Sequence, residues 1–179
     1  MSERRTVDYH DGSVVLTLHE REIQVLQWVF SDLGRMLTDH DRSPGDGGSS
    51  VDAVTQRLYP RAYLDPTEEA AENQWQELVH DDLVEARLSA MTEVVRSLDA
   101  AVPVPGYEGA REILLDEERA GMWIRVLNDA RLAIGTALEV TPEWDLDAID
   151  PADPNFELHA LYAWMTQLLG ALLAVQGGG

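Results

Sequence analysis

The chain has 179 residues, of which 33 are acidic and 13 are basic, so its formal net charge at pH 7 is −20. It has no cysteine, and every basic residue is an arginine, which excludes thiol nucleophiles, disulfides, thiolate metal sites and lysine-dependent catalysis. The negative charge also disfavours direct nucleic-acid binding, because that affinity comes mostly from basic groups.

Hydrophobic residues make up 45% of the chain and charged residues 26%, which is the balance of a folded globular protein. The length fits a single domain over residues 1–179. No uninterrupted apolar run approaches the roughly 18 residues that cross a bilayer, and the N-terminus lacks the apolar core of a signal peptide. We therefore expect a cytoplasmic protein with no membrane partner.

Residues 5–18 alternate loosely around Asp11-Gly12, a pattern compatible with a short N-terminal β-hairpin. Thr17 and Glu20 then have the spacing of a capping box at the start of a helix over 18–38. The helix has one apolar stripe, formed by Ile23, Leu26, Phe30, Leu33 and Leu37. Residues 39–50 are rich in Gly, Ser, Asp and Pro and predict a flexible loop.

Further helices follow. A short one is expected around 51–58, and one or two over 66–99, capped by Asp65-Pro66 and with a potential break near His80. Residues 101–110 form a connector, after which Asp116 caps a helix with an apolar stripe, formed by Trp123, Leu127, Ala130, Ile134 and Leu138.

A second connector covers residues 141–154, and the chain ends in a frayed tail at 177–179. Between them, a helix over 155–176 has a long apolar stripe, formed by Leu158, Leu161, Met165, Leu168, Leu172 and Val175. The stripe suits either a seam between two chains or packing within one core. We favour packing within the core, and hence a monomer over a homodimer. The predicted fold is mainly α: a single-domain bundle of four to five main helices, with at most a short N-terminal hairpin.

Signatures of catalysis are lacking in the sequence. No serine lies in a Gly-x-Ser-x-Gly motif, and no glycine-rich phosphate loop follows a strand. Glu77 and His80 have the helical spacing of a di-iron motif, but no second copy of that motif exists. We therefore expect no enzymatic activity, no metal and no cofactor.

The densest polar feature within a helix is formed by Asn128, Arg131 and Gly135. They stand three and four residues apart and so lie on one helix face beside the apolar stripe. Two interpretations remain open. The cluster is either an intramolecular bracket that holds two helices in register or a polar contact site for a partner.

Three segments carry a family resemblance. They are Leu58-Tyr59-Pro60 through Ala62-Tyr63 to Asp65 with the run Glu69 to Glu72, then Asp81-Asp82-Leu83 with Arg87-Leu88, and finally Leu127-Asn128-Asp129 with Arg131-Leu132 and Gly135. In their order and spacing, the chain from about residue 14 to residue 175 resembles the actinobacterial oxidative-stress regulator family, AosR, whose members are typically encoded beside the ClpS adaptor.

The resemblance implies a small cytoplasmic protein that senses oxidants through cysteines and modulates transcription by joining a stress sigma factor and the transcription machinery. Because this chain has no cysteine, a thiol switch cannot operate in it. We therefore expect a non-catalytic regulator of the transcriptional oxidative-stress response, with a sigma factor or RNA polymerase component as its protein partner. The expected contact residues, which could equally brace the core, are Asp81, Asp82, Arg87, Asn128, Asp129, Arg131 and Gly135. The alternative function is that of an adaptor or partner in Clp-dependent regulated proteolysis.

Overall fold

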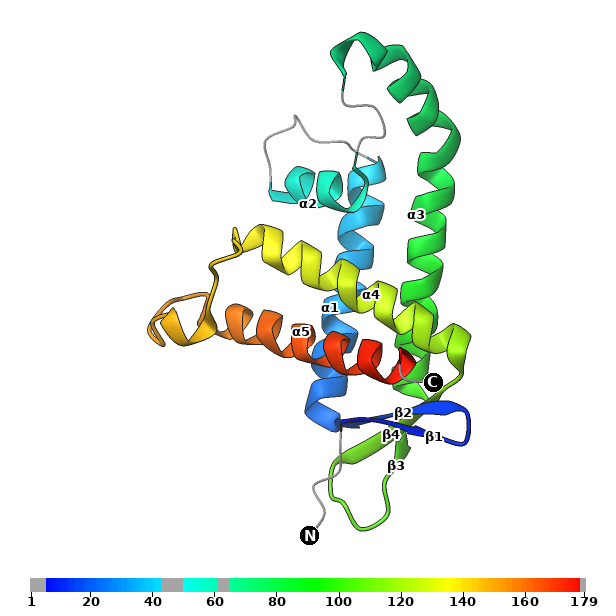
Figure 1. The fold of residues 1–179 in the computed structure, drawn as a ribbon, viewed down its shortest axis with the longest axis vertical. Helices are drawn as coiled ribbons and strands as arrows, with labels where there is room; N and C mark the ends of the chain where they lie inside the picture. The colour runs from blue at the N-terminus through cyan, green and yellow to red at the C-terminus, as the bar shows by residue number, and fades with distance from the viewer. Residues whose placement is uncertain (1–5, 43–49, 61–64, 178–179) are drawn as a thin grey trace.

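The computed structural model describes residues 6–42, 50–60 and 65–177. Two long helices, α1 (Glu20–Arg42) and α3 (Glu69–Asp99), run roughly along the long axis of the molecule in Figure 1. Helices α4 (Glu117–Ala137) and α5 (Phe156–Gln176) cross them, and a small β-sheet lies below these helices in the view.

The sheet begins with an N-terminal hairpin. Strands β1 (Val7–His10) and β2 (Ser13–His19) pair antiparallel, with Val7 opposite Leu16. Asp11 and Gly12 have φ angles of 48° and 82°, the left-handed conformations that an Asp-Gly turn supplies in a two-residue hairpin. The hairpin that the alternating pattern suggested is therefore present.

Two further strands make the fold α+β, so the prediction of a mainly α bundle is wrong. Strand β4 (Ala110–Leu115) pairs with β2, and β3 (Val102–Pro103) pairs with β4, giving the order β1-β2-β4-β3. An isolated two-stranded hairpin is only marginally stable in water. Strand β4 extends the hairpin and adds the buried side chains of Ile113 and Leu115 to the apolar face of the sheet. The connector predicted at 101–110 thus contains β3 and the first residue of β4.

Strand β3 lies at the edge of the sheet. Val102 is opposite Glu112 and Pro103 is opposite Arg111. The amide of Val104 donates to the carbonyl oxygen of Ala110 at 2.9 Å. Since successive residues of an antiparallel strand alternate between its two sides, Pro103 occupies the position that faces away from β4.

Helix α1 begins two residues later than expected. Thr17 lies in β2, opposite Glu112, and does not cap the helix. Instead, the backbone amide of His19 donates to Glu22 Oε2 at 2.7 Å, and His19 Nδ1 accepts from the amide of Arg21 at 3.2 Å. The whole predicted stripe of α1 is buried. Residues 39–42 of the predicted loop are helical, and residues 43–49 lie outside the described part of the chain.

The middle of the chain is helical, as expected. Helix α2 (Ser50–Leu58) matches the short helix predicted there. Asp65 caps the 3-10 turn η1 (Pro66–Glu68), and its side chain accepts from the amide of Thr67 at 2.9 Å. Helix α3 then continues without a break through His80.

Helix α4 starts as predicted, because Asp116 Oδ1 accepts from the amide of Arg119 at 2.8 Å. Of its predicted stripe, Trp123, Leu127 and Ala130 are buried, and Ile134 and Leu138 are half-buried. The predicted connector at 141–154 contains a 3-10 turn, η2 (Leu146–Ala148). Gly177 is the C-cap that follows α5, and residues 178–179 lie outside the described part of the chain.

Helix α5 packs against α4 and against β1 and β2, and its Met165, Leu168 and Leu172 are buried. By length and composition it could also cross a membrane, since an 18-residue window has a mean hydropathy of 1.4, with 28% of that window buried. The sequence expectation concerned uninterrupted apolar runs, and α5 reaches this length only as an average over the window. Polar residues such as Thr166 and Gln167 interrupt the apolar run but leave the average high.

Candidate functional site

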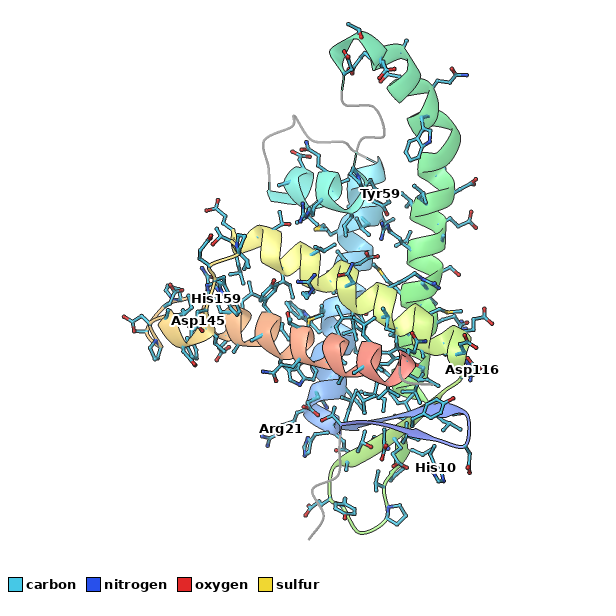
Figure 2. The ribbon with its side chains drawn as sticks, in the orientation of Figure 1. His10, Arg21, Tyr59, Asp116, Asp145 and His159 are labelled. Atoms are coloured by element: carbon cyan, nitrogen blue, oxygen red, sulfur yellow. The ribbon has the colours of Figure 1, made fainter. Side chains whose placement is uncertain are left out.

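Arg87 lies where three helices meet. Its guanidinium forms an ion pair with Asp129 of α4, whose residue surface is only 7% exposed. Arg87 Nη2 also donates to the carbonyl oxygen of Leu58, at the end of α2, at 2.8 Å. The guanidinium lies over the ring of Tyr59, 4.9 Å from its centre, and Figure 2 shows Tyr59 at this end of α2. Arg87 therefore connects α2, α3 and α4.

Burial raises the pKa of Asp129 above the ordinary value for an aspartate, since desolvation disfavours the charged carboxylate. The hydrogen bond and charge of Arg87, and the charge of Arg125, oppose this rise. The carboxylate thus depends on Arg87 to offset part of the cost of its burial.

A second polar group joins α4 to α5. Arg131 donates from Nη1 to the hydroxyl of Tyr162 and from Nη2 to Asn128 Oδ1, both at 3.2 Å. A Cβ atom placed on Gly135 would lie 2.9 Å from Tyr162 Cε2, so only glycine leaves room for this ring. The Tyr162 ring also meets Trp144 edge to face, with the ring centres 5.0 Å apart.

The seven candidate residues therefore fall into three places. Arg87 and Asp129 join α2, α3 and α4, whereas Arg131 and Gly135 meet Tyr162 of α5 and Asn128 accepts a hydrogen bond from Arg131 within α4. Asp81 and Asp82 are exposed on α3, more than one helical turn before Arg87. The contacts of the first two groups are intramolecular, so a partner surface has to be sought elsewhere on the molecule.

An exposed apolar surface lies between α1 and α5. Trp28 is 62% exposed and Val25 is 40% exposed, both on α1. They line a groove of about 650 Å³ whose other wall is formed by Leu158, Leu161 and Trp164 of α5. We call this the α1/α5 groove. A second hollow of about 240 Å³ shares Trp28 and Leu158 with it and extends along α1 to Met36.

Sequence reasoning missed this groove because it followed only the core stripe of α1. A second stripe, Val25, Trp28 and Met36, runs beside the first at spacings of three and eight residues, with Asp32 between its last two members. A periodic pattern predicts that such side chains share a helix face, and it does not distinguish a covered face from an exposed one.

The segment that precedes α5 is acidic and is attached to that helix. Trp144 Nε1 donates to His159 Nδ1 at 3.0 Å, and the two rings stack with their centres 6.0 Å apart. Figure 2 shows His159 and Asp145 together at this end of α5. The segment has five exposed carboxylates and no basic residue: Glu143, Asp145, Asp147, Asp150 and Asp153.

Another hollow, of about 320 Å³, lies between α3, α4 and β4. Its polar lining is internally paired, since Arg96 pairs with Glu93 and Ser97 Oγ accepts from Trp123 Nε1 at 3.0 Å. Among the described residues, no group of three or more His, Cys, Asp or Glu side chains could hold a metal ion. The side chains of Glu77 and His80 lie outside the described part of the chain.

The molecule is thus an α+β protein in which buried charges connect helices and an apolar groove is open to solvent. Residues 4–176 match the model of the DUF2017 family, described as a domain of unknown function, and the chain belongs to this family. No curated protein and no solved structure matches the chain.

Proposed function

We propose that this protein is a cytoplasmic, non-catalytic regulator that acts by protein–protein contact in the transcriptional oxidative-stress response. One observation carries the proposal: Trp28 is 62% exposed at the α1/α5 groove. Exposed apolar patches mark interaction sites, and tryptophan is enriched among the residues that dominate binding energy. The resemblance of the Leu58–Asp65, Asp81–Leu88 and Leu127–Gly135 segments to the AosR family supports the transcriptional setting.

The proposed partner is a sigma factor or another component of RNA polymerase, reached without direct contact to nucleic acid or membrane. The net charge of −20 supports a protein partner over a phosphate backbone. Regulation here does not use a thiol switch, because the chain has no cysteine.

The test is quantitative co-purification from the protein's own cells. Tagged wild-type protein is compared with Trp28→Ala and with Leu114→Ala, a matched control whose side chain is 64% exposed on the sheet. We expect polymerase subunits or a sigma factor to co-purify with the wild type and with Leu114→Ala. Their recovery should fall about tenfold with Trp28→Ala.

The same experiment distinguishes the alternative role in regulated proteolysis. Recovery of ClpS or a Clp ATPase in place of polymerase components would replace the transcriptional proposal with the proteolytic one. Equal recovery of polymerase components with the wild type and Trp28→Ala would remove the observation on which the proposal is based.

A further inference from the structure

We infer that the α1/α5 groove binds a basic amphipathic helix of the partner protein. The inference rests on the proposed function, because it specifies the segment by which the partner is recognised. It is argued from the walls of the groove, from the charges around it and from the net charge of the chain.

The walls of the groove favour a helix over an extended strand. Val25 and Trp28 form one wall, and Leu158, Leu161 and Trp164 form the other. Both walls belong to helices, whose interior backbone amides are already bonded within the helix. The groove therefore offers side chains and not a free strand edge. A helix that lays its apolar face into such a groove satisfies its own backbone and needs only side-chain contacts.

The length of the apolar surface also suits a helix. The hollow along α1 continues the groove past Trp28 and Leu158 toward Met36 and Ala133. Trp28 thus lines both hollows, where a bound helix that spans them would cover it. Residues in this position dominate the binding energy of an interface.

The charged side chains that line the groove are acidic and favour a partner with positive charge. Its acidic residues are Glu22 and Glu157, with Asp32 in the adjoining hollow, and no basic residue lines either one within the described part of the chain. Asp32 pairs with Arg35 at 2.5 Å, and Glu22 Oε2 accepts from the amide of His19. The 143–153 segment, with its five carboxylates, leads directly into Pro154 and Asn155, which line the groove. Arginine or lysine residues flanking the apolar face of a helix would complement this surface.

A second copy of this chain does not fit the same surface. Each copy has a net charge of −20, and a symmetric contact would place Glu22 and Glu157 of one copy near the same acidic groups of the other. Like charges brought together at an interface oppose association.

The test uses three synthetic peptides of about 20 residues each. The first has leucines on one helix face and arginines and lysines elsewhere, the second has the same composition in scrambled order, and the third replaces each basic residue with glutamate. Their dissociation constants are measured by fluorescence anisotropy at low and at physiological ionic strength. We expect the first peptide to bind best and to weaken as salt is added.

Two pairs of variants test the position of the peptide. Trp28→Ala should raise the dissociation constant of the first peptide about tenfold or more, and the exposed control Leu114→Ala should leave it unchanged. Glu157→Arg at the groove should weaken binding more than Asp82→Arg, which makes the same change in net charge on α3. All four side chains are at least partly exposed, and circular dichroism of each variant checks that it is folded.

Several results would overturn the inference. These are equal binding of the amphipathic and scrambled peptides, preference for the acidic peptide, absence of binding, and insensitivity to Trp28→Ala. A dimer in sedimentation that Trp28→Ala dissociates would assign the groove to a second copy. Trp28-dependent binding of phosphatidylcholine vesicles without peptide binding would assign the groove to lipid.

If polymerase co-purification depends on Trp28 while the peptide does not bind, only the basic helix is rejected. If the peptide binds and co-purification fails, only the transcriptional role is rejected.

Discussion

Arg87 supports the structure through three contacts at once: the Asp129 carboxylate, the Leu58 carbonyl oxygen and the Tyr59 ring. We predict that Arg87→Ala lowers the free energy of unfolding by about 3 kcal/mol, because it leaves Asp129 buried without its cation. Urea denaturation measures the loss. The control is Arg96→Ala, which removes an exposed pair with Glu93 and should cost less than about 1 kcal/mol. Equal losses for the two variants would contradict this account.

Asp129 also predicts an unusual dependence of stability on pH. Its raised pKa means that the folded protein holds the carboxyl proton more tightly than the unfolded chain does. The stabilisation that Asp129 adds to the free energy of unfolding is therefore fully present below the ordinary aspartate pKa. It is lost as the pH rises through the raised pKa of Asp129 in the folded protein.

We expect the difference in unfolding free energy between Asp129→Asn and the wild type to move in favour of the variant as the pH rises through this window. Urea denaturation from about pH 3 to about pH 7 measures the difference, and the other carboxylates cancel from it. Movement in the opposite direction would mean that the attraction of Arg87 outweighs the burial of Asp129.

For single residues, the sequence predicts which side chains share a helix face but not which residues they contact. Helical spacing places Asn128, Arg131 and Gly135 on one face of α4. It does not identify Tyr162, which accepts from Arg131 and lies close to Gly135. Arg87 and Asp129 are 42 residues apart and come together only when α3 packs against α4. Asp81 and Asp82 belong with Arg87 to one segment of the family resemblance, yet they are exposed on α3.

At the scale of elements, the amphipathic helices and the N-terminal hairpin were predictable, and strands β3 and β4 were not. The stripe of α1 and the cap of α4 follow from local spacing and from a local hydrogen bond. Strand β3 has only two residues, Val102 and Pro103, and proline and glycine nearby resemble a loop. Strand β4 is defined by its pairing with β2, about 95 residues earlier, and such pairing leaves little trace in local sequence.

The α4–α5 contact yields a prediction about the close approach at Gly135. Alanine is preferred over glycine within a helix by about 1 kcal/mol, yet here its Cβ would lie 2.9 Å from the Tyr162 ring. Arg131 and Trp144 hold that ring in place. We expect Gly135→Ala to lower the free energy of unfolding in the wild type and to raise it in a Tyr162→Ala background. A double-mutant cycle measures the coupling, and equal effects in both backgrounds would refute it.

At the scale of the whole molecule, α4 connects the other elements. It packs against α1, α2, α3 and α5 and also contacts β2 and β4. We therefore predict a single cooperative unfolding transition, as expected for one domain over residues 1–179. Circular dichroism and the fluorescence of the five tryptophans should give the same midpoint in urea. Two separated midpoints would indicate that the sheet and the helices unfold independently.

The short edge strand affects how copies of this protein behave at high concentration. Because Pro103 occupies the outward position of β3, that side of the strand has no amide hydrogen there to offer an incoming strand. Adding strands from neighbouring molecules is how sheets grow into fibrils, and a proline at the boundary interrupts that growth. The sheet therefore ends at β3 by its own chemistry, and growth of the sheet from this edge, as distinct from the β1 edge, is disfavoured.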